Sequence, residues 1–140
     1  MTDLNQQFSP YERLGGESGV KNLVVRFYQL MDELLEAATI RAMHPVSLAG
    51  SEEKLFLFLS GWLGGPQLYV EKYGHPRLRG RHLPFAVDES ARDAWMLCMT
   101  RAVNELVTDD VLLRDHLLAS LYKTADFMRN QPKLGANDGQ

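Results

Sequence analysis

The sequence predicts an all-α fold, and three observations support this. Apolar residues recur at three- and four-residue steps over several long stretches. Clusters of glycine and proline separate these stretches from one another. No segment alternates apolar and polar residues in the way that a half-buried strand does. We therefore expect about five main helices, with one irregular connection between the third and the fourth.

Length and composition indicate one globular domain. The chain has 140 residues, of which 45% are hydrophobic and 24% charged. We expect the domain at residues 11–131, after a flexible N-terminal arm at 1–10 and before a frayed tail at 132–140. A net charge of -3 favours neither nucleic acid nor an anionic membrane as partner.

Several features predict a soluble, cytoplasmic protein. The only cysteine, Cys98, cannot form an internal disulfide, which fits a reducing compartment. The first ten residues carry no export signal. The longest nearly apolar run, at residues 55–65, is too short to cross a bilayer.

The first half of the chain predicts a short turn, a long helix and a shorter segment. Residues 11–14 can form one helical turn, which Gly15 and Gly16 end. From Glu17 a helical stripe begins, in which Tyr28 lies at the edge, so its ring points inward and its hydroxyl requires a partner. Residues 36–43 form a weaker helical segment, which stops at His44 because the following proline disfavours helical angles there.

The second half predicts three further helices. Ser51 is a good N-cap for a helix that closes at residues 64–66, and residues 67–73 can add one or two turns. Asp88 is the expected cap of the next helix. The last helix starts at residues 108–110 and is expected to continue until Pro132.

The connection at residues 74–87 carries the most unusual chemistry. It holds two histidines, three arginines and Phe85. Pro84 follows His82 by two positions, so a helical turn that carries His82 must end almost at once. A lone histidine beside apolar helices is typical of a satisfied structural residue. The alternative is a ligand to the metal of a flat apolar cofactor, and spacing alone leaves both open.

Five separated motifs resemble one known family. They are R-F-Y at 26–28, L-A-G-S-E-E-K-L at 48–55, G-G-P at 64–66, G-H-P-R-L-R-G-R-H-L-P-F at 74–85 and R-D-A-W-M-L-C-M at 92–99. Together they are similar to the group II, or O-type, truncated haemoglobins over residues 11–128. This resemblance implies a two-over-two helical sandwich that holds haem b, with His82 as the proximal iron ligand. A backbone carbonyl should then accept from the other ring nitrogen. The chain has no C-x-x-C-H motif, so we expect the haem to be non-covalent.

The resemblance also implies a polar pocket for a diatomic ligand, lined by Tyr28, His44, Ser51, Leu55 and Trp95. Bound dioxygen carries partial negative charge on its outer atom, so each donor to it is worth about 1.5 to 3 kcal/mol. Donors on Tyr28 and Trp95 would together slow oxygen release on the order of a hundredfold or more.

Two positions of this pocket have alternative roles. His44 stands where this family often has tyrosine. Its alternative roles are to bond the ligand, to orient Tyr28, to swing toward the iron, or to face solvent. We favour a polar network with Tyr28. Ser51 stands where many globins have a distal histidine, and it either leaves that entrance open or is a plain helix cap.

Other residues are expected to contact the cofactor. Arg81 and Lys54 can pair with the haem propionates, and Tyr69 and His75 fit the same rim. The three arginines of residues 77–81 could instead mark a nucleic-acid patch, which the net charge disfavours. The apolar contacts expected for the macrocycle are Phe58, Leu59, Leu78, Phe85 and Met99.

Three functions follow, from different classes. The first is binding of oxygen, nitric oxide or carbon monoxide for storage, scavenging or sensing. The second is an enzyme that oxidises nitric oxide to nitrate or reduces peroxide, with a reductase as possible partner. The third is a helical interaction domain without haem, which the motifs disfavour. We expect a monomer or weak dimer. The physiological ligand and the sixth iron ligand cannot be derived from the sequence.

Overall fold

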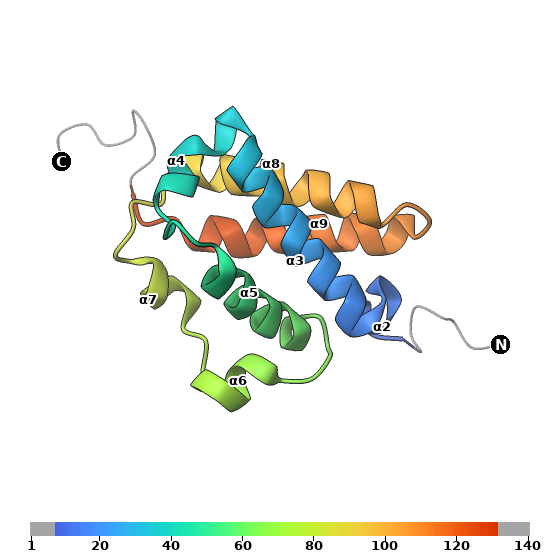
Figure 1. Ribbon diagram of the computed structural model, residues 1–140. Helices are drawn as coiled ribbons and strands as arrows, with labels where there is room; N and C mark the ends of the chain where they lie inside the picture. The colour runs from blue at the N-terminus through green and yellow to red at the C-terminus, as the bar shows by residue number, and fades with distance from the viewer. Residues whose placement is uncertain (1–7, 132–140) are drawn as a thin grey trace.

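The computed structural model describes residues 8–131. The expected N-terminal arm lies mostly, and the expected C-terminal tail entirely, outside these residues. Within them every regular element is a helix, so the all-α prediction is confirmed (Figure 1). In chain order the elements are α2 (Pro10–Leu14), α3 (Gly16–Glu33), η1 (Leu35–Ala37), α4 (Ala38–Ala42), α5 (Ala49–Trp62), α6 (Leu68–Tyr73), α7 (Leu78–His82), α8 (Glu89–Leu106) and α9 (Val111–Phe127).

Four long helices form two crossed pairs. α8 and α9 run side by side, and α3 packs against both α8 and α5 (Figure 1). The short helix α6 packs on α5, and α7 follows it at the edge of the molecule. This is the two-over-two arrangement that the resemblance implied.

The core is built around α3. Its apolar residues at three- and four-residue spacing lie on one face, and Phe27 is 0% exposed. Burying a side chain of that size stabilises the fold by about 1.5 to 3 kcal/mol. The buried residues of this helix are Val20, Leu23, Val24, Phe27, Tyr28, Leu30 and Met31.

Side-chain caps fix the starts of three helices. Ser9 accepts a hydrogen bond from the amide of Glu12, Asp88 from the amide of Ala91, and Asp110 from the amide of Leu113. The predicted cap at Asp88 is therefore confirmed, and the last helix is capped by Asp110.

The predicted cap at Ser51 is wrong. α5 begins at Ala49, so Ser51 is the third residue of the helix. The side chain of Arg41 fixes the preceding loop, because it donates to the carbonyls of Pro45 and Val46 at 2.9 and 2.8 Å. Ser47 accepts from the amide of Ala49. These contacts start the helix three residues earlier than Ser51 would as its N-cap.

Two glycines in helices should respond oppositely to alanine. A Cβ on Gly19 would overlap the backbone carbonyl of Leu14, whereas a Cβ on Gly50 would meet no described atom within 4 Å. We expect Gly19→Ala to lower the free energy of unfolding by about 1 to 3 kcal/mol through this overlap. Gly50→Ala should leave it unchanged or raise it by up to about 1 kcal/mol, the usual helix preference for alanine. Urea denaturation of both variants tests this, and equal effects would contradict it.

The last helix ends earlier than predicted. We expected it to continue to Pro132, but α9 ends at Phe127. The residues that follow leave the helix and bond to another part of the chain, since the amide of Asn130 donates to the carbonyl of Val87 at 2.9 Å.

None of the described helices is long and apolar enough to cross a membrane.

Candidate functional site

His82 is the last residue of the short helix α7. Pro84 ends this helix, as predicted, and Leu83 is its C-cap. The Nδ1 atom of His82 lies 2.7 Å from the carbonyl oxygen of Leu78. A carbonyl can only accept, so Nδ1 carries the proton and Nε2 of the neutral ring keeps its lone pair. Such a nitrogen can bind a metal, and Leu78 supplies the carbonyl that the sequence could not identify.

The aromatic residues of the predicted ligand pocket lie on neighbouring helices. The ring of Tyr28 on α3 packs on Phe27 at 4.9 Å between centroids, and Phe27 packs on Trp95 of α8 at 5.0 Å. Phe27 therefore spaces the two predicted donors. The sequence placed Phe27 in the core without indicating this role.

The Tyr28 hydroxyl has no hydrogen-bond partner among the described residues, although its side chain is only 7% exposed. No fully enclosed side-chain nitrogen or oxygen of the described residues lacks a partner. The hydroxyl must therefore border accessible space. Burial, followed by the negative charge of Glu52, raises the pKa of Tyr28. The phenol thus stays protonated and can donate to a group that enters this space.

His44 contacts Tyr28 through its ring. The two ring centroids lie 5.8 Å apart in an edge-on arrangement. The Nδ1 atom of His44 lies 2.8 Å from the carbonyl oxygen of Ile40, so it is protonated. We expected a polar network between His44 and Tyr28. Among the described residues the two side chains meet through their rings, and no hydrogen bond joins them.

A hollow of about 490 Å³ lies beside His44, between the end of α3 and α4. Of the predicted site residues only His44 lines it, so this hollow is not the predicted cofactor site. It is lined by Met31, Asp32, Glu33, Leu34, Leu35, Ala38, Arg41, Ala42, His44 and Val46.

The predicted rim residues of α5, α6 and α7 contact one another. Phe58 packs on Tyr69 at 6.3 Å between centroids, and the guanidinium of Arg81 lies 5.8 Å from the centre of the Tyr69 ring. Arg81 also donates through Nε to the carbonyl of Pro76 at 2.7 Å. Its terminal amino groups have no partner among the described residues. The ammonium of Lys54 lies 6.0 Å from the Tyr73 ring centre.

The remaining predicted residues differ in burial. Leu59 and Met99 are almost fully buried in the core, and Ser51, Leu55 and Leu78 are half-buried. Phe85 is 42% exposed. The exposed His75 accepts from the amide of Arg77, which has a left-handed backbone with φ 49°.

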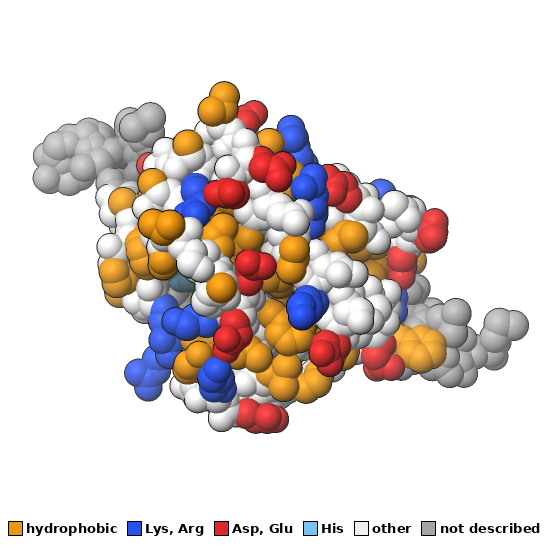
Figure 2. Space-filling view, in the orientation of Figure 1, with side chains coloured by type: hydrophobic (Ala, Val, Ile, Leu, Met, Phe, Trp, Pro, Cys, Tyr) orange, Lys and Arg blue, Asp and Glu red, His pale blue; other side chains and the backbone are white. Residues whose placement is uncertain are grey.

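The exposed apolar surface fits a flat apolar cofactor. Leu83 is 57% exposed and Phe85 42%, and they lie one and three residues after His82. Figure 2 shows hydrophobic side chains gathered on the face where α5, α6 and α7 lie, with lysine and arginine side chains at its edge. Large exposed apolar patches mark binding sites. An apolar face, a ring nitrogen with a free lone pair and cationic groups at the rim match haem with its two propionates.

One residue that the sequence analysis missed is Asn130, which donates to the carbonyl oxygen of His82. An asparagine two residues before Pro132, the expected helix end, is the only signal, and it is weak. The partner lies 48 positions away in the sequence, so no local pattern could indicate it.

The chain is similar to known proteins along most of its length. Residues 9–130 match the family model described as bacterial-like globin. The group 2 truncated hemoglobin YjbI of Bacillus subtilis (strain 168) is 36% identical over 129 residues, which cover 91% of this chain and 94% of that protein.

Two solved structures share the fold. The group II 2-on-2 hemoglobin from Agrobacterium tumefaciens matches with a TM-score of 0.86 and 44% identity, covering 94% of this chain and all of that one. A truncated oxygen-avid haemoglobin from Bacillus subtilis matches with a TM-score of 0.80 and 36% identity, covering 88% of this chain and all of that one.

Proposed function

Because the chain belongs to the bacterial-like globin family, and within it to the group II truncated haemoglobins, we propose that it binds haem b non-covalently through His82 and takes up dioxygen in a polar pocket. The observation that carries this proposal is the bond from Nδ1 of His82 to the carbonyl of Leu78, which leaves Nε2 free. When bound, haem would supply an iron atom that His82 would hold and to which a diatomic gas could bind.

Tyr28 and Trp95 are the proposed donors to that gas. Tyr28 remains protonated and its hydroxyl borders accessible space. Trp95 also packs on Phe27, and its indole N–H has no partner among the described residues. A similar protein from Bacillus subtilis is described as oxygen-avid, which supports tight oxygen binding here. Ser51 and Leu55 on α5 complete the proposed pocket, and nitric oxide and carbon monoxide fit the same space.

The haem propionates are proposed to lie at the rim. The terminal amino groups of Arg81 have no partner there among the described residues, and its guanidinium lies against the Tyr69 ring. Lys54 on α5 supplies a second cation near the same edge. Guanidinium and carboxylate match each other in two parallel hydrogen bonds, so Arg81 is the stronger partner. Three further expectations stay predictions: that the protein is a monomer or weak dimer, that it is cytoplasmic, and that a reductase serves it.

The visible spectrum of the protein tests the proposal. Purified protein mixed with equimolar haemin should show a Soret band, and the reduced form should shift that band reversibly when oxygen or carbon monoxide is added. The ferric and deoxy-ferrous spectra also report whether a sixth ligand is present. A chain that folds but leaves haemin in its free spectrum would contradict the proposal.

The ionisation of Tyr28 gives an independent test that needs no gas. An ordinary tyrosine loses its proton near pH 10, in the range from about pH 9 to 11. Burial raises the pKa of Tyr28, so its phenol should remain neutral over that range. We therefore expect the wild type and Tyr28→Phe to gain the same phenolate absorbance in an ultraviolet titration of the folded protein. One additional phenolate in the wild type would show that Tyr28 is not held neutral.

A further inference from the structure

The helix that carries His82 has little support of its own. α7 has five residues, none of them buried, and no side chain caps its start. Among the described elements, none of the extensive helix contacts involves α7. Something outside the helix must therefore fix the place of the His82 ring.

The side chain of Asn130 makes this link. Its Nδ2 group donates to the carbonyl oxygens of His82 at 3.1 Å and of Phe85 at 2.9 Å. Its Oδ1 atom accepts from the amide of Val87 at 3.0 Å. The backbone amide of Asn130 donates to the carbonyl of Val87 at 2.9 Å. Two carbonyls and one amide fix which end of the side chain is oxygen, and a carboxamide supplies both the donors and the acceptor that these partners need.

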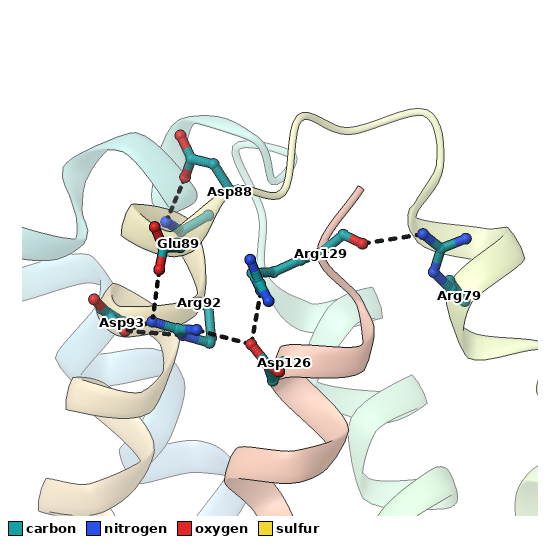
Figure 3. Close-up of polar contacts among 8 residues, drawn as sticks. Arg79, Asp88, Glu89, Arg92, Asp93, Asp126 and Arg129 are labelled. Atoms are coloured by element: carbon teal, nitrogen blue, oxygen red, sulfur yellow. Dashed lines mark hydrogen bonds and ion pairs between the residues drawn. The ribbon is translucent and has the colours of Figure 1, made fainter. Parts of the chain in front are cut away.

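A network of charges anchors the same corner. Arg79 of α7 donates to the carbonyl of Arg129 at 3.2 Å (Figure 3). Arg129 and Arg92 both bond Asp126 at 2.7 Å, which joins α9 to α8. Arg92, then Arg129, lowers the pKa of Asp126, so its carboxylate stays charged. The residues around Asn130 are thus bonded to α8 and α9, the two helices of one pair.

We propose that Asn130 is a positioning residue for His82. By binding the His82 carbonyl and the turn behind it to the end of α9, it sets where Nε2 of the ring lies. The inference rests on the proposed function, in which His82 holds iron. Asn130 does not touch the cofactor or the gas, and its effect passes through the backbone of residues 82–87.

The variant Asn130→Asp tests this with almost no change of shape. An aspartate keeps the acceptor for Val87 but replaces both N–H donors with a negatively charged oxygen that faces two carbonyls. The matched control is His116→Ala, since His116 is exposed on α9 and makes no side-chain hydrogen bond among the described residues. The first measurement is the iron–histidine Raman line of the deoxy-ferrous protein. The second is the rate of haem transfer to excess apomyoglobin, and the third is amide hydrogen exchange of the folded chain.

We expect Asn130→Asp to shift the iron–histidine line and to speed haem loss about tenfold or more, because two hydrogen bonds to carbonyls are lost. Exchange should accelerate at residues 78–87 and stay unchanged in α3. His116→Ala should match the wild type. If the variant retains too little haem for Raman, exchange that accelerates only at residues 78–87 still supports the proposal.

An unshifted line with unchanged haem loss would overturn the role of Asn130. Exchange that accelerates throughout the chain would also overturn it, since it would show a general loss of stability. Both results leave the proposed function intact. A wild type without any iron–histidine line would instead contradict the proposed function itself, so the two failures are distinguishable.

Discussion

Replacing His82 with alanine is expected to abolish the Soret band of the purified protein. The imidazole is the group proposed to anchor the iron, and its Nε2 lone pair is available because Nδ1 is bonded to Leu78. Without it the porphyrin is held by apolar contacts and the rim cations only. Imidazole added to the solution should restore much of the band, because it fills the space of the lost ring. Absorption spectra of the reconstituted variants measure both effects.

The matched control is His116→Ala. His116 is exposed on α9 and makes no side-chain hydrogen bond among the described residues, so its loss should leave the spectrum unchanged. Circular dichroism should show that both variants stay helical. A His82→Ala protein with the full wild-type spectrum would show that another residue holds the iron.

Local signals predicted much of the fold around this site. Asp88 caps α8 because a side-chain carboxylate beside the first turn satisfies a free amide. α7 ends at His82 because Pro84 stops it two residues later. Both effects act within three or four residues, so they can be derived from the sequence alone.

Other features depend on side-chain contacts that the rules for caps and periodicity do not contain, whether the partners are near or far in the sequence. The start of α5 is set by Arg41 and not by Ser51, because Arg41 holds the two carbonyls of the loop before it. α9 ends at Phe127 because Asn130 bonds to Val87, 43 positions earlier. No rule for caps or periodicity contains such partners. They become visible only when the chain is folded.

The candidate site also combines features that the sequence predicted with features that it could not. The helical stripe of α3 predicted that the Tyr28 ring points inward, and that ring is buried. The stripe could not show that His44 bonds Ile40 and meets Tyr28 only through ring edges. Nor could it show that Phe27 lies between Tyr28 and Trp95. The placement of individual residues relative to the bound gas stays a prediction.

Removing the proposed donors is expected to speed oxygen dissociation. Tyr28→Phe deletes one hydroxyl and keeps the ring that packs on Phe27 and His44. Trp95→Phe deletes the indole N–H and keeps an aromatic ring beside Phe27. A hydrogen bond to a charged acceptor is worth about 1.5 to 3 kcal/mol. Each variant should therefore release oxygen at least about tenfold faster, measured by stopped-flow displacement with carbon monoxide.

The double variant shows whether the two donors act independently. Both rings pack on Phe27, and both groups are proposed to bond the same gas. Additive free energies would make the double variant release oxygen on the order of a hundredfold faster or more, and a smaller increase would show that the two donors are coupled. Carbon monoxide acquires less charge than oxygen, so its release should change much less in all three proteins. Tyr122→Phe on the exposed side of α9 is the control without effect. Unchanged oxygen rates in both single variants would place the gas outside the reach of Tyr28 and Trp95. A similar increase for both gases would attribute the change to the shape of the pocket, because a lost hydrogen bond distinguishes a charged ligand from a nearly neutral one.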